Sequence, residues 1–481
     1  MYRNQENYIM YEQNRKYIGV KFFHIVLLVF LLILTIYLRE DKQSIEYWDK
    51  IISSIAIIML LFQLIGFYLL KVSILDFKFW FLALTYLFMF GIVFLLAFGY
   101  EEYVFWDLHT QFPKDILFKA GFCILNYIQA FYVGAIFYQK RKYSKIYNSI
   151  VVEDAKKMQK NLFITGIILF VATLPFRLLN DIPLILSAME SKNYFKISIS
   201  VGLTDDIAFL FVPAVVYIIS SKVLHKKINV LFSLLISSYL GVVMILTGDR
   251  RYCVTGILAI VLCLMKTYDF KMSFISVTFG YIVSIFSLNI LTVIRNIRKG
   301  YLLSLTDFFI QNSDKIFSPV YALKNTVIET MAEFGISFFS VVQIVKNIPN
   351  NIGFQYGMGF WGAIPSIMPI GWLVPEYFFK VTISSYINLI EKRPVGETII
   401  GDLYANFGVL YIFASLILGF IISHLFSFDS TKNKNLSIAR YYSLFYIEIN
   451  LVRACFFEVF RNSIVIYCIP LCILYFLKKK L

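Results

Sequence analysis

Long apolar runs separated by short polar segments dominate the chain. A helix needs about 20 largely apolar residues to cross the hydrocarbon core of a bilayer, and runs of this kind recur along the sequence. The pattern predicts an all-α, polytopic integral membrane protein in which residues 1–481 form a single membrane domain. Twelve spans are predicted, at residues 22–38, 51–70, 79–99, 116–138, 161–178, 205–220, 230–247, 252–266, 273–294, 403–425, 438–456 and 462–477.

The basic residues between these runs indicate the orientation of the chain. Lys and Arg concentrate in the cytoplasmic loops of membrane proteins. Seven of them lie in segment 139–160, between the fourth and fifth predicted spans, and Lys478, Lys479 and Lys480 follow the last span. We therefore expect a multi-pass protein with both termini in the cytoplasm.

Composition narrows the function classes. Only 16% of the residues are charged, against roughly 25% in soluble domains. A net charge of +15 would indicate nucleic-acid binding in a soluble protein, but here basic loops explain it, and we expect no nucleic-acid partner. The six Cys lie in apolar runs without a CxxC pair, and the four His are scattered. The sequence therefore predicts no metal site and no cofactor.

The long segment 295–402 interrupts the series of spans and is expected outside the cytoplasm. Its many Phe, Trp, Ile and Tyr residues indicate a structured loop rather than a disordered one. Residues 319–334 carry an apolar stripe at helical spacing, with Glu329 and Glu333 on the opposite face. Two interpretations follow: an amphipathic helix on the bilayer with its glutamates in water, or a helix with one glutamate facing a substrate cavity.

A stretch rich in glycine and aromatic residues follows at 353–362, and three prolines come after it. It is too broken for a spanning helix and too apolar for a free loop. Irregular backbone at membrane depth persists only where protein or a wet cavity covers it. We expect a re-entrant or interfacial segment packed on the spans. Its aromatic rings could stack on sugars, but anchoring at the membrane interface explains Trp361 and Trp372 equally well.

Several charged residues fall at the outer ends of the predicted spans, where the cytoplasmic bias of basic residues would not place them. Charges at membrane depth are costly and are commonly functional. Arginine forks bind phosphate oxygens in bidentate pairs, so these residues indicate a diphosphate at the interface. Snorkelling explains any single arginine as well, and Arg453 could instead form a buried ion pair with Glu458 or Asp402. The basic residues are Arg177, Arg250, Arg251, Arg295, Arg298, Lys299, Arg453 and Arg461.

The segment that leads into the tenth predicted span resembles a known motif. Residues 396–408 read GETIIGDLYANFG, which is similar to the acid-x-Tyr-x-Asn-Phe-Gly motif of bacterial O-antigen and capsular polysaccharide repeat-unit polymerases of the Wzy type. Asp402, Tyr404 and Asn406 occupy its polar positions. The sequence departs from the family in two places: GET stands where many members have Gly-Gly-Ser, and Asp402 stands for the more usual Glu.

Two arginine-containing segments also fit the family. The turn at 247–251 reads TGDRR and resembles a Gly-x-Arg turn of these polymerases, and Arg295 and Arg298 follow the next span. The resemblance implies that Arg250, Arg251, Arg295, Arg298 and Arg453, with Tyr404 and Asn406, bind the substrate and its diphosphate. It also implies an acid–base carboxylate, for which Asp402, Glu397 and Glu333 are the candidates.

The same resemblance implies the activity. A metal-independent membrane glycosyltransferase of GT-C-like architecture in the bacterial plasma (inner) membrane would polymerise undecaprenyl-diphosphate-linked oligosaccharide repeat units at the outer face. The product would be O-antigen or capsular polysaccharide. The implied partners are these lipid-linked oligosaccharides, the lipid bilayer, a chain-length regulator and a flippase.

Three alternatives remain at this point. An O-antigen-type ligase would share the topology and the arginines, although the long segment lacks the histidine that ligases commonly use. A polysaccharide flippase or other transporter would usually show repeated halves and broken helices at mid-membrane. A non-catalytic assembly protein would not need the outer arginines.

Overall fold

The structure is a computed structural model of the whole chain, and its regular elements are helices throughout the described part. The all-α class predicted from the apolar runs is confirmed. The predicted span 273–294 lies outside the described residues. These are residues 2–104, 108–138, 152–190, 203–247, 251–270, 327–367, 381–392, 396–427 and 433–480, with the single positions Asp314, Ser318, Val320 and Tyr377.

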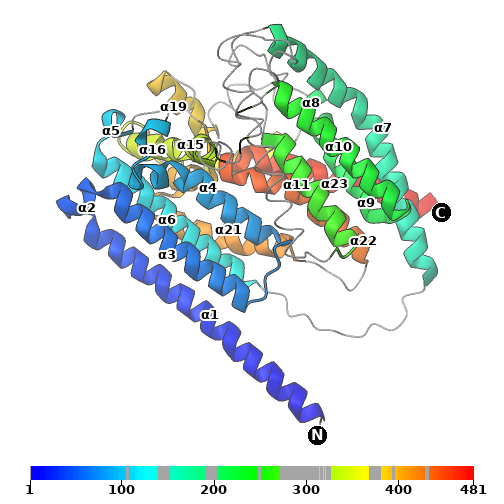
Figure 1. Cartoon of the computed structure of the whole chain (residues 1–481), viewed down its shortest axis with the longest axis horizontal. Helices are drawn as coiled ribbons and strands as arrows, with labels where there is room; N and C mark the ends of the chain where they lie inside the picture. The colour runs from blue at the N-terminus through cyan, green and yellow to red at the C-terminus, as the bar shows by residue number, and fades with distance from the viewer. Residues whose placement is uncertain are drawn as a thin grey trace.

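The first group of helices comes from the N-terminal third of the chain and from α21, and its members lie side by side (Figure 1). A buried polar network joins four of them. The Gln63 amide donates to Gln129 Oε1 at 2.9 Å, Tyr86 donates to Gln63 Oε1 at 2.9 Å, and Gln129 donates to the His24 carbonyl at 2.8 Å. Because buried polar groups must be paired, this network fixes how the helices pack. The elements are α1 (Tyr2–Leu38), α2 (Lys42–Glu46), α3 (Trp48–Leu69), α4 (Phe77–Ala97), η1 (Glu101–Tyr103), α5 (Leu108–Gln111), α6 (Lys114–Phe137) and α21 (Tyr411–Leu425).

Small residues allow close approach of helix backbones in this group. A Cβ on Gly134 of α6 would lie 2.0 Å from the Leu416 carbonyl oxygen of α21. A Cβ on Gly91 of α4 would lie 2.4 Å from the Met331 carbonyl oxygen of α15 (Val327–Gly335), a helix of the long segment that packs on this group. Without a hydrophobic force between helices in lipid, such close packing is a main source of their association.

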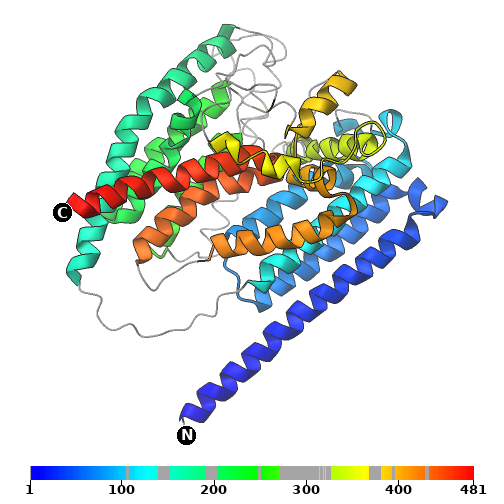
Figure 2. The same ribbon diagram turned by 180° about the vertical axis from the view of Figure 1, so that it is seen from behind.

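The second group forms the other part of the molecule (Figure 2). Asn433 caps α22 by accepting a hydrogen bond from the Leu436 N–H at 3.1 Å. Pro175 and Pro183 lie within α7, and Pro470 lies within α23, as spanning helices tolerate. The elements are α7 (Val152–Glu190), α8 (Leu203–Phe209), α9 (Phe211–Ser221), α10 (Lys226–Thr247), α11 (Arg251–Thr267), α22 (Lys434–Glu448), η6 (Ile449–Arg453) and α23 (Phe456–Lys480).

The remaining elements come from the long segment and from the motif that follows it. α15 and α16 together form an apolar stretch, Val327–Asn347, which is long enough to span a membrane and packs against α4. The elements are α15 (Val327–Gly335), α16 (Ser337–Asn347), α17 (Met358–Trp361), η4 (Pro365–Ile367), α19 (Ile383–Glu391), α20 (Ile399–Phe407) and η5 (Gly408–Leu410).

Ten helical stretches in the described part are long and apolar enough to cross a membrane. Nine of them match predicted spans, and the tenth is Val327–Asn347. The predicted spans at 252–266 and 438–456 correspond to α11 and α22, helices of 17 and 15 residues. The chain is therefore a polytopic membrane protein.

Candidate functional site

The motif segment forms α20, and Thr398 begins it. The Thr398 hydroxyl accepts a hydrogen bond from the Gly401 N–H at 3.1 Å, which is the arrangement of an N-cap. Thr398, and not the acidic Asp402 four residues later, therefore caps this helix, and the Asp402 side chain bonds to another element.

Asp402 connects α20 to the start of α23. Its carboxylate is only 4% exposed. Oδ2 accepts a hydrogen bond from the backbone N–H of Phe456 at 2.9 Å, and Oδ1 accepts one from the Asn406 amide at 2.8 Å. A buried carboxylate with both oxygens bonded holds its neighbours in place, because moving it would leave those donors unpaired.

Asn406 connects the same helix to the aromatic, glycine-rich segment. Its Oδ1 accepts a hydrogen bond from the Gly359 N–H at 2.9 Å. A Cβ at Gly359 would lie 2.8 Å from Asn406 Nδ2, so the backbone can approach only because this residue is glycine. The Gln355 N–H adds a bond to the Ala405 carbonyl at 2.9 Å. The polar residues of the motif thus fasten segment 353–362 to α20.

The aromatic rings of this segment divide between the interior and the surface. Phe360 stacks on Phe456 with ring centroids 4.4 Å apart. Tyr404 is buried with its ring 6.2 Å from that of Phe354. Tyr356 and Trp361 are 83% and 73% exposed, so their rings are available to a sugar or to lipid. Trp372 lies outside the described residues.

Two arginines pair with carboxylates around the first turns of α23. Glu458 Oε1 lies 3.0 Å from Arg251 Nη2 and also accepts a hydrogen bond from the Tyr252 hydroxyl. The Arg251 guanidinium lies over the Tyr252 ring, 4.9 Å from its centroid. One turn further along α23, Arg461 forms an ion pair with Asp206 of α8. α23, whose first residue donates a hydrogen bond to Asp402, therefore contributes one residue to each of these two ion pairs within its first two turns.

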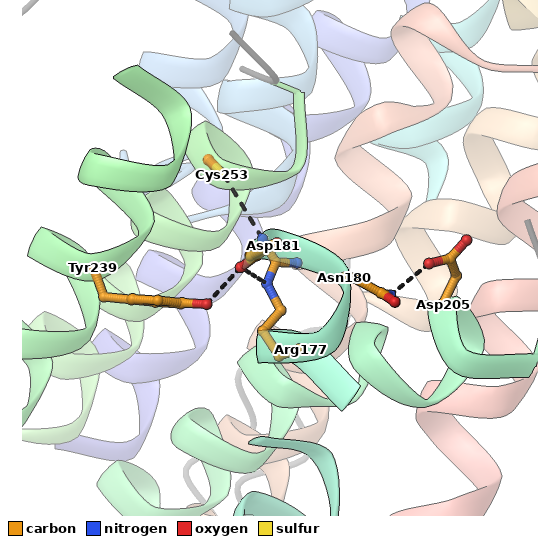
Figure 3. A network of polar contacts seen from close by, with 6 residues as sticks. All are labelled: Arg177, Asn180, Asp181, Asp205, Tyr239 and Cys253. Atoms are coloured by element: carbon orange, nitrogen blue, oxygen red, sulfur yellow. Dashed lines mark hydrogen bonds and ion pairs between the residues drawn. The ribbon is translucent and has the colours of Figure 1, made fainter. Parts of the chain in front are cut away.

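A third pair, which is more buried, lies within α7 and faces α10 (Figure 3). Arg177 Nε is 2.7 Å from Asp181 Oδ2, and the Tyr239 hydroxyl donates to the same oxygen at 2.5 Å. Arg177 also approaches the Cys253 sulfur at 4.0 Å, two residues after Arg251. Both charges are largely buried, so this neutral pair stabilises the packing of α7 against α10 and α11.

The other predicted site residues lie nearby or outside the described part. Glu397 is half-buried and accepts a hydrogen bond from the Ser384 N–H at 3.0 Å. Arg453 lies in η6, three residues before α23, with its guanidinium 5.2 Å from the Phe88 ring centroid. Glu333 is half-buried on α15, beside Phe334, whose ring is 5.0 Å from Phe88. Three predicted arginines, Arg250, Arg295 and Arg298, lie outside the described residues.

Comparison with known proteins identifies the family. The family model described as O-antigen polysaccharide polymerase Wzy matches residues 20–481, nearly the whole chain. The chain belongs to the Wzy family. It is therefore an O-antigen repeat-unit polymerase with glycosyltransferase-type activity, which acts on lipid-linked oligosaccharides in the membrane. The ligase and transporter alternatives are not favoured. No curated protein and no solved structure matches the chain.

Some residues and contacts around this Wzy site were not predicted from the sequence. Glu448 is 8% exposed in α22 and accepts a hydrogen bond from the Ser463 hydroxyl at 2.7 Å. The sequence could have singled out this residue, because a carboxylate within a predicted membrane span is a candidate functional residue. The contacts of Gly359 and of the Phe456 N–H have no such signal, because they depend on how distant segments meet. Among the described residues of this Wzy chain, no cluster of His, Cys, Asp and Glu could hold a metal ion.

Proposed function

We propose that this Wzy polymerase works at the outer face of the bacterial plasma membrane, with its diphosphate site around the start of α23. The observation that carries the proposal is the convergence on one helix end. Asp402 bonds to the first residue of α23, and Arg251 and Arg461 pair with carboxylates around its first two turns. Helix N-termini carry partial positive charge, and arginine forks match phosphate oxygens, so both favour a bound diphosphate.

The reaction in this proposal is displacement at an anomeric carbon. The acceptor hydroxyl oxygen of a new undecaprenyl-diphosphate-linked unit attacks the anomeric carbon of the growing chain. The bond from that carbon to the donor diphosphate breaks, and the electron pair leaves with the diphosphate. Fixed positive charge stabilises the departing group, and a carboxylate accepts the hydroxyl proton. In this scheme Arg251 and Arg453, with Arg250, Arg295 and Arg298, provide that charge in place of a metal ion.

The candidate carboxylates take different roles in the proposal. Both oxygens of Asp402 accept hydrogen bonds inside the protein, which supports a positioning role. Glu397 is half-buried, and a backbone N–H bonds to its Oε1, so it is the better candidate to receive the proton. Glu333 remains an alternative on the neighbouring α15. Burial of Tyr404 and Asn406 favours a supporting role for both, in which they hold the aromatic segment beside the substrate.

Orientation in the membrane is part of the same proposal. α23 is a 25-residue helix that begins at the arginine site and ends on lysines, and at 1.5 Å per residue it is about 37 Å long. That length separates the two membrane faces. If the lysine end is cytoplasmic, as the basic bias of cytoplasmic loops indicates, the arginine end faces outward. A flippase would deliver the repeat units there, and a chain-length regulator would act on the product.

The test is a glycan gel from a strain that lacks the protein and is restored with single variants. We expect wild type to restore the polymer ladder and Arg251→Gln to leave single repeat units on the surface, with equal amounts of both proteins in the membrane. Lys434→Gln is the matched control, because it removes one cation that pairs with Asp269 at the opposite end of the bundle. A normal ladder with Arg251→Gln would refute the proposed diphosphate site. Full-length polymer left on its lipid carrier would instead indicate a ligase.

A further inference from the structure

The starts of α7 and α22 lie beside the end of α23, at the end of that helix remote from the arginine site (Figure 2). Residues from these three helices line a cavity there. Its volume is about 480 Å³, within the range of about 300–1,000 Å³ that is typical of small-molecule sites. Three of its lining residues are polar or charged: Asn161 of α7, Arg440 of α22 and Lys478 of α23. Apolar side chains, among them Leu436, Leu471 and Leu474, form much of the remaining wall.

The polar groups of this cavity are not satisfied by the described protein residues. Asn161 is 3% exposed, and its Oδ1 has no hydrogen-bond partner among them. The Arg440 Nε is also without one, and no described carboxylate forms an ion pair with this arginine. Its guanidinium lies over the Tyr467 ring, 5.6 Å from the ring centroid. Buried polar groups and charges are normally paired, so the Arg440 Nε–H indicates a ligand with negatively charged oxygens, and Asn161 Oδ1, an acceptor, indicates a hydrogen-bond donor on the same ligand.

We propose that this cavity binds one anionic phospholipid, with its phosphodiester on Arg440 and an acyl chain along α23. A phosphate oxygen pairs with the arginine fork, and Asn161 Oδ1 accepts a hydrogen bond from a hydroxyl group of the headgroup. Lys478 adds a second cation at the exposed end of the helix. Basic pockets between spanning helices are a recurring form of anionic lipid site.

The geometry favours a phospholipid over the lipid-linked substrate. Phe456 marks the arginine site, and Lys478 lines the cavity 22 residues later on the same helix, which places them roughly 33 Å apart. A diphosphate bound at one end of α23 therefore cannot fill the cavity at the other. The apolar wall also favours a lipid over free phosphate, because an inorganic ion makes no favourable contact with leucine side chains. The inference does not depend on the proposed catalytic roles.

Native mass spectrometry of the full-length protein in detergent tests the proposal. The protein is incubated separately with dioleoyl phosphatidylglycerol, with dioleoyl phosphatidylethanolamine and with undecaprenyl diphosphate, and inorganic phosphate is then added as a competitor. We expect preferential retention of one phosphatidylglycerol and a loss of roughly tenfold in its affinity for Arg440→Gln, as for one charge-assisted hydrogen bond. Lys434→Gln is the control, since it removes the same charge from the same helix outside the cavity.

Two further variants protect the test against misfolding. Lys478→Gln alters an exposed helix end and should weaken retention by a smaller factor. Leu471→Trp fills the cavity without changing its charge and should also remove the lipid. Equal retention by wild type and Arg440→Gln would overturn the proposal. So would displacement of the lipid by inorganic phosphate, which indicates an anion site only, or preferential retention of undecaprenyl diphosphate.

Discussion

Replacing Asp402 separates a positioning role from a proton-accepting role. Asp402→Ala removes the acceptor for the Phe456 N–H and one acceptor of the Asn406 amide, both within a buried site. Asp402→Asn keeps one oxygen for the Phe456 N–H but turns an NH₂ group toward the Asn406 amide. The two variants therefore damage the same contacts to different degrees.

The expected loss of stability follows from these contacts. A buried donor left without a partner costs about 1–3 kcal/mol. The Asn406 amide retains its second bond, to the Asp402 carbonyl at 2.9 Å, so its loss is partial. We expect Asp402→Ala to lower the free energy of unfolding by about 2–4 kcal/mol and Asp402→Asn by about 1–2 kcal/mol. Both values are large against a total stability of about 5–15 kcal/mol.

Two measurements on the same samples distinguish the roles. Tryptophan fluorescence follows unfolding of the detergent-solubilised protein, and a glycan gel follows polymer in cells grown at a permissive temperature. With a positioning role, Asp402→Asn still produces a polymer ladder, and the amount of its polymer falls only in proportion to the amount of its folded protein. If Asp402→Asn is folded and present at wild-type levels but makes no polymer, the positioning role is refuted. An Asp402→Ala protein as stable as wild type would refute the contact analysis itself.

Three other substitutions test separate parts of the structure. Glu458→Gln should abolish polymer at normal protein levels because Arg251 loses its carboxylate; a normal ladder would contradict this. Gly134→Ala should separate α6 from α21, since its Cβ would meet the Leu416 carbonyl oxygen, and should destabilise the fold by about 1–3 kcal/mol; an unchanged unfolding midpoint would argue against that contact. Trp361→Ala should shorten the polymer while Trp361→Phe preserves it, if this exposed ring stacks on sugar; equal ladders would favour membrane anchoring.

Much of the architecture could be predicted from local sequence. The apolar runs identify nine of the ten stretches long enough to span, because membrane crossing is decided by length and hydropathy within one segment. The stretch Val327–Asn347 was harder, because Glu329, Glu333 and Lys346 interrupt it and its mean hydropathy is the lowest of the ten. Its burial against α4 is a property of the folded chain that no window along the sequence reports.

The candidate site was only partly accessible to the same reasoning. Charge and position at span ends drew attention to Asp402 and Arg251, and the resemblance to the polymerase motif drew attention to Asn406. Asp402 and Asn406 lie on α20, and Arg251 lies at the start of α11, next to the start of α23. Their partners could not be foreseen. The Asp402 carboxylate meets a backbone N–H 54 positions later, and Asn406 meets a glycine 47 positions earlier. Every residue except proline has the same backbone N–H group, so the sequence does not reveal which of them pairs with a distant side chain. Only the folded arrangement of the helices determines such a pairing.

These pairings give the family motif a physical meaning beyond direct contact with substrate. The acid holds the start of α23, the asparagine holds the aromatic segment, and Gly408 ends α20 with a φ of +54°, a conformation that other residues rarely adopt. A substitution that removes one of these contacts, such as Asp402→Ala, therefore moves the arginine end of α23 or the exposed aromatic rings relative to each other, whereas Asp402→Asn keeps an oxygen for the Phe456 N–H. Because an error of about 1 Å in a bound group is enough to slow a transfer reaction severely, variants that lose such a contact are expected to lose activity even where none of these side chains touches the sugar.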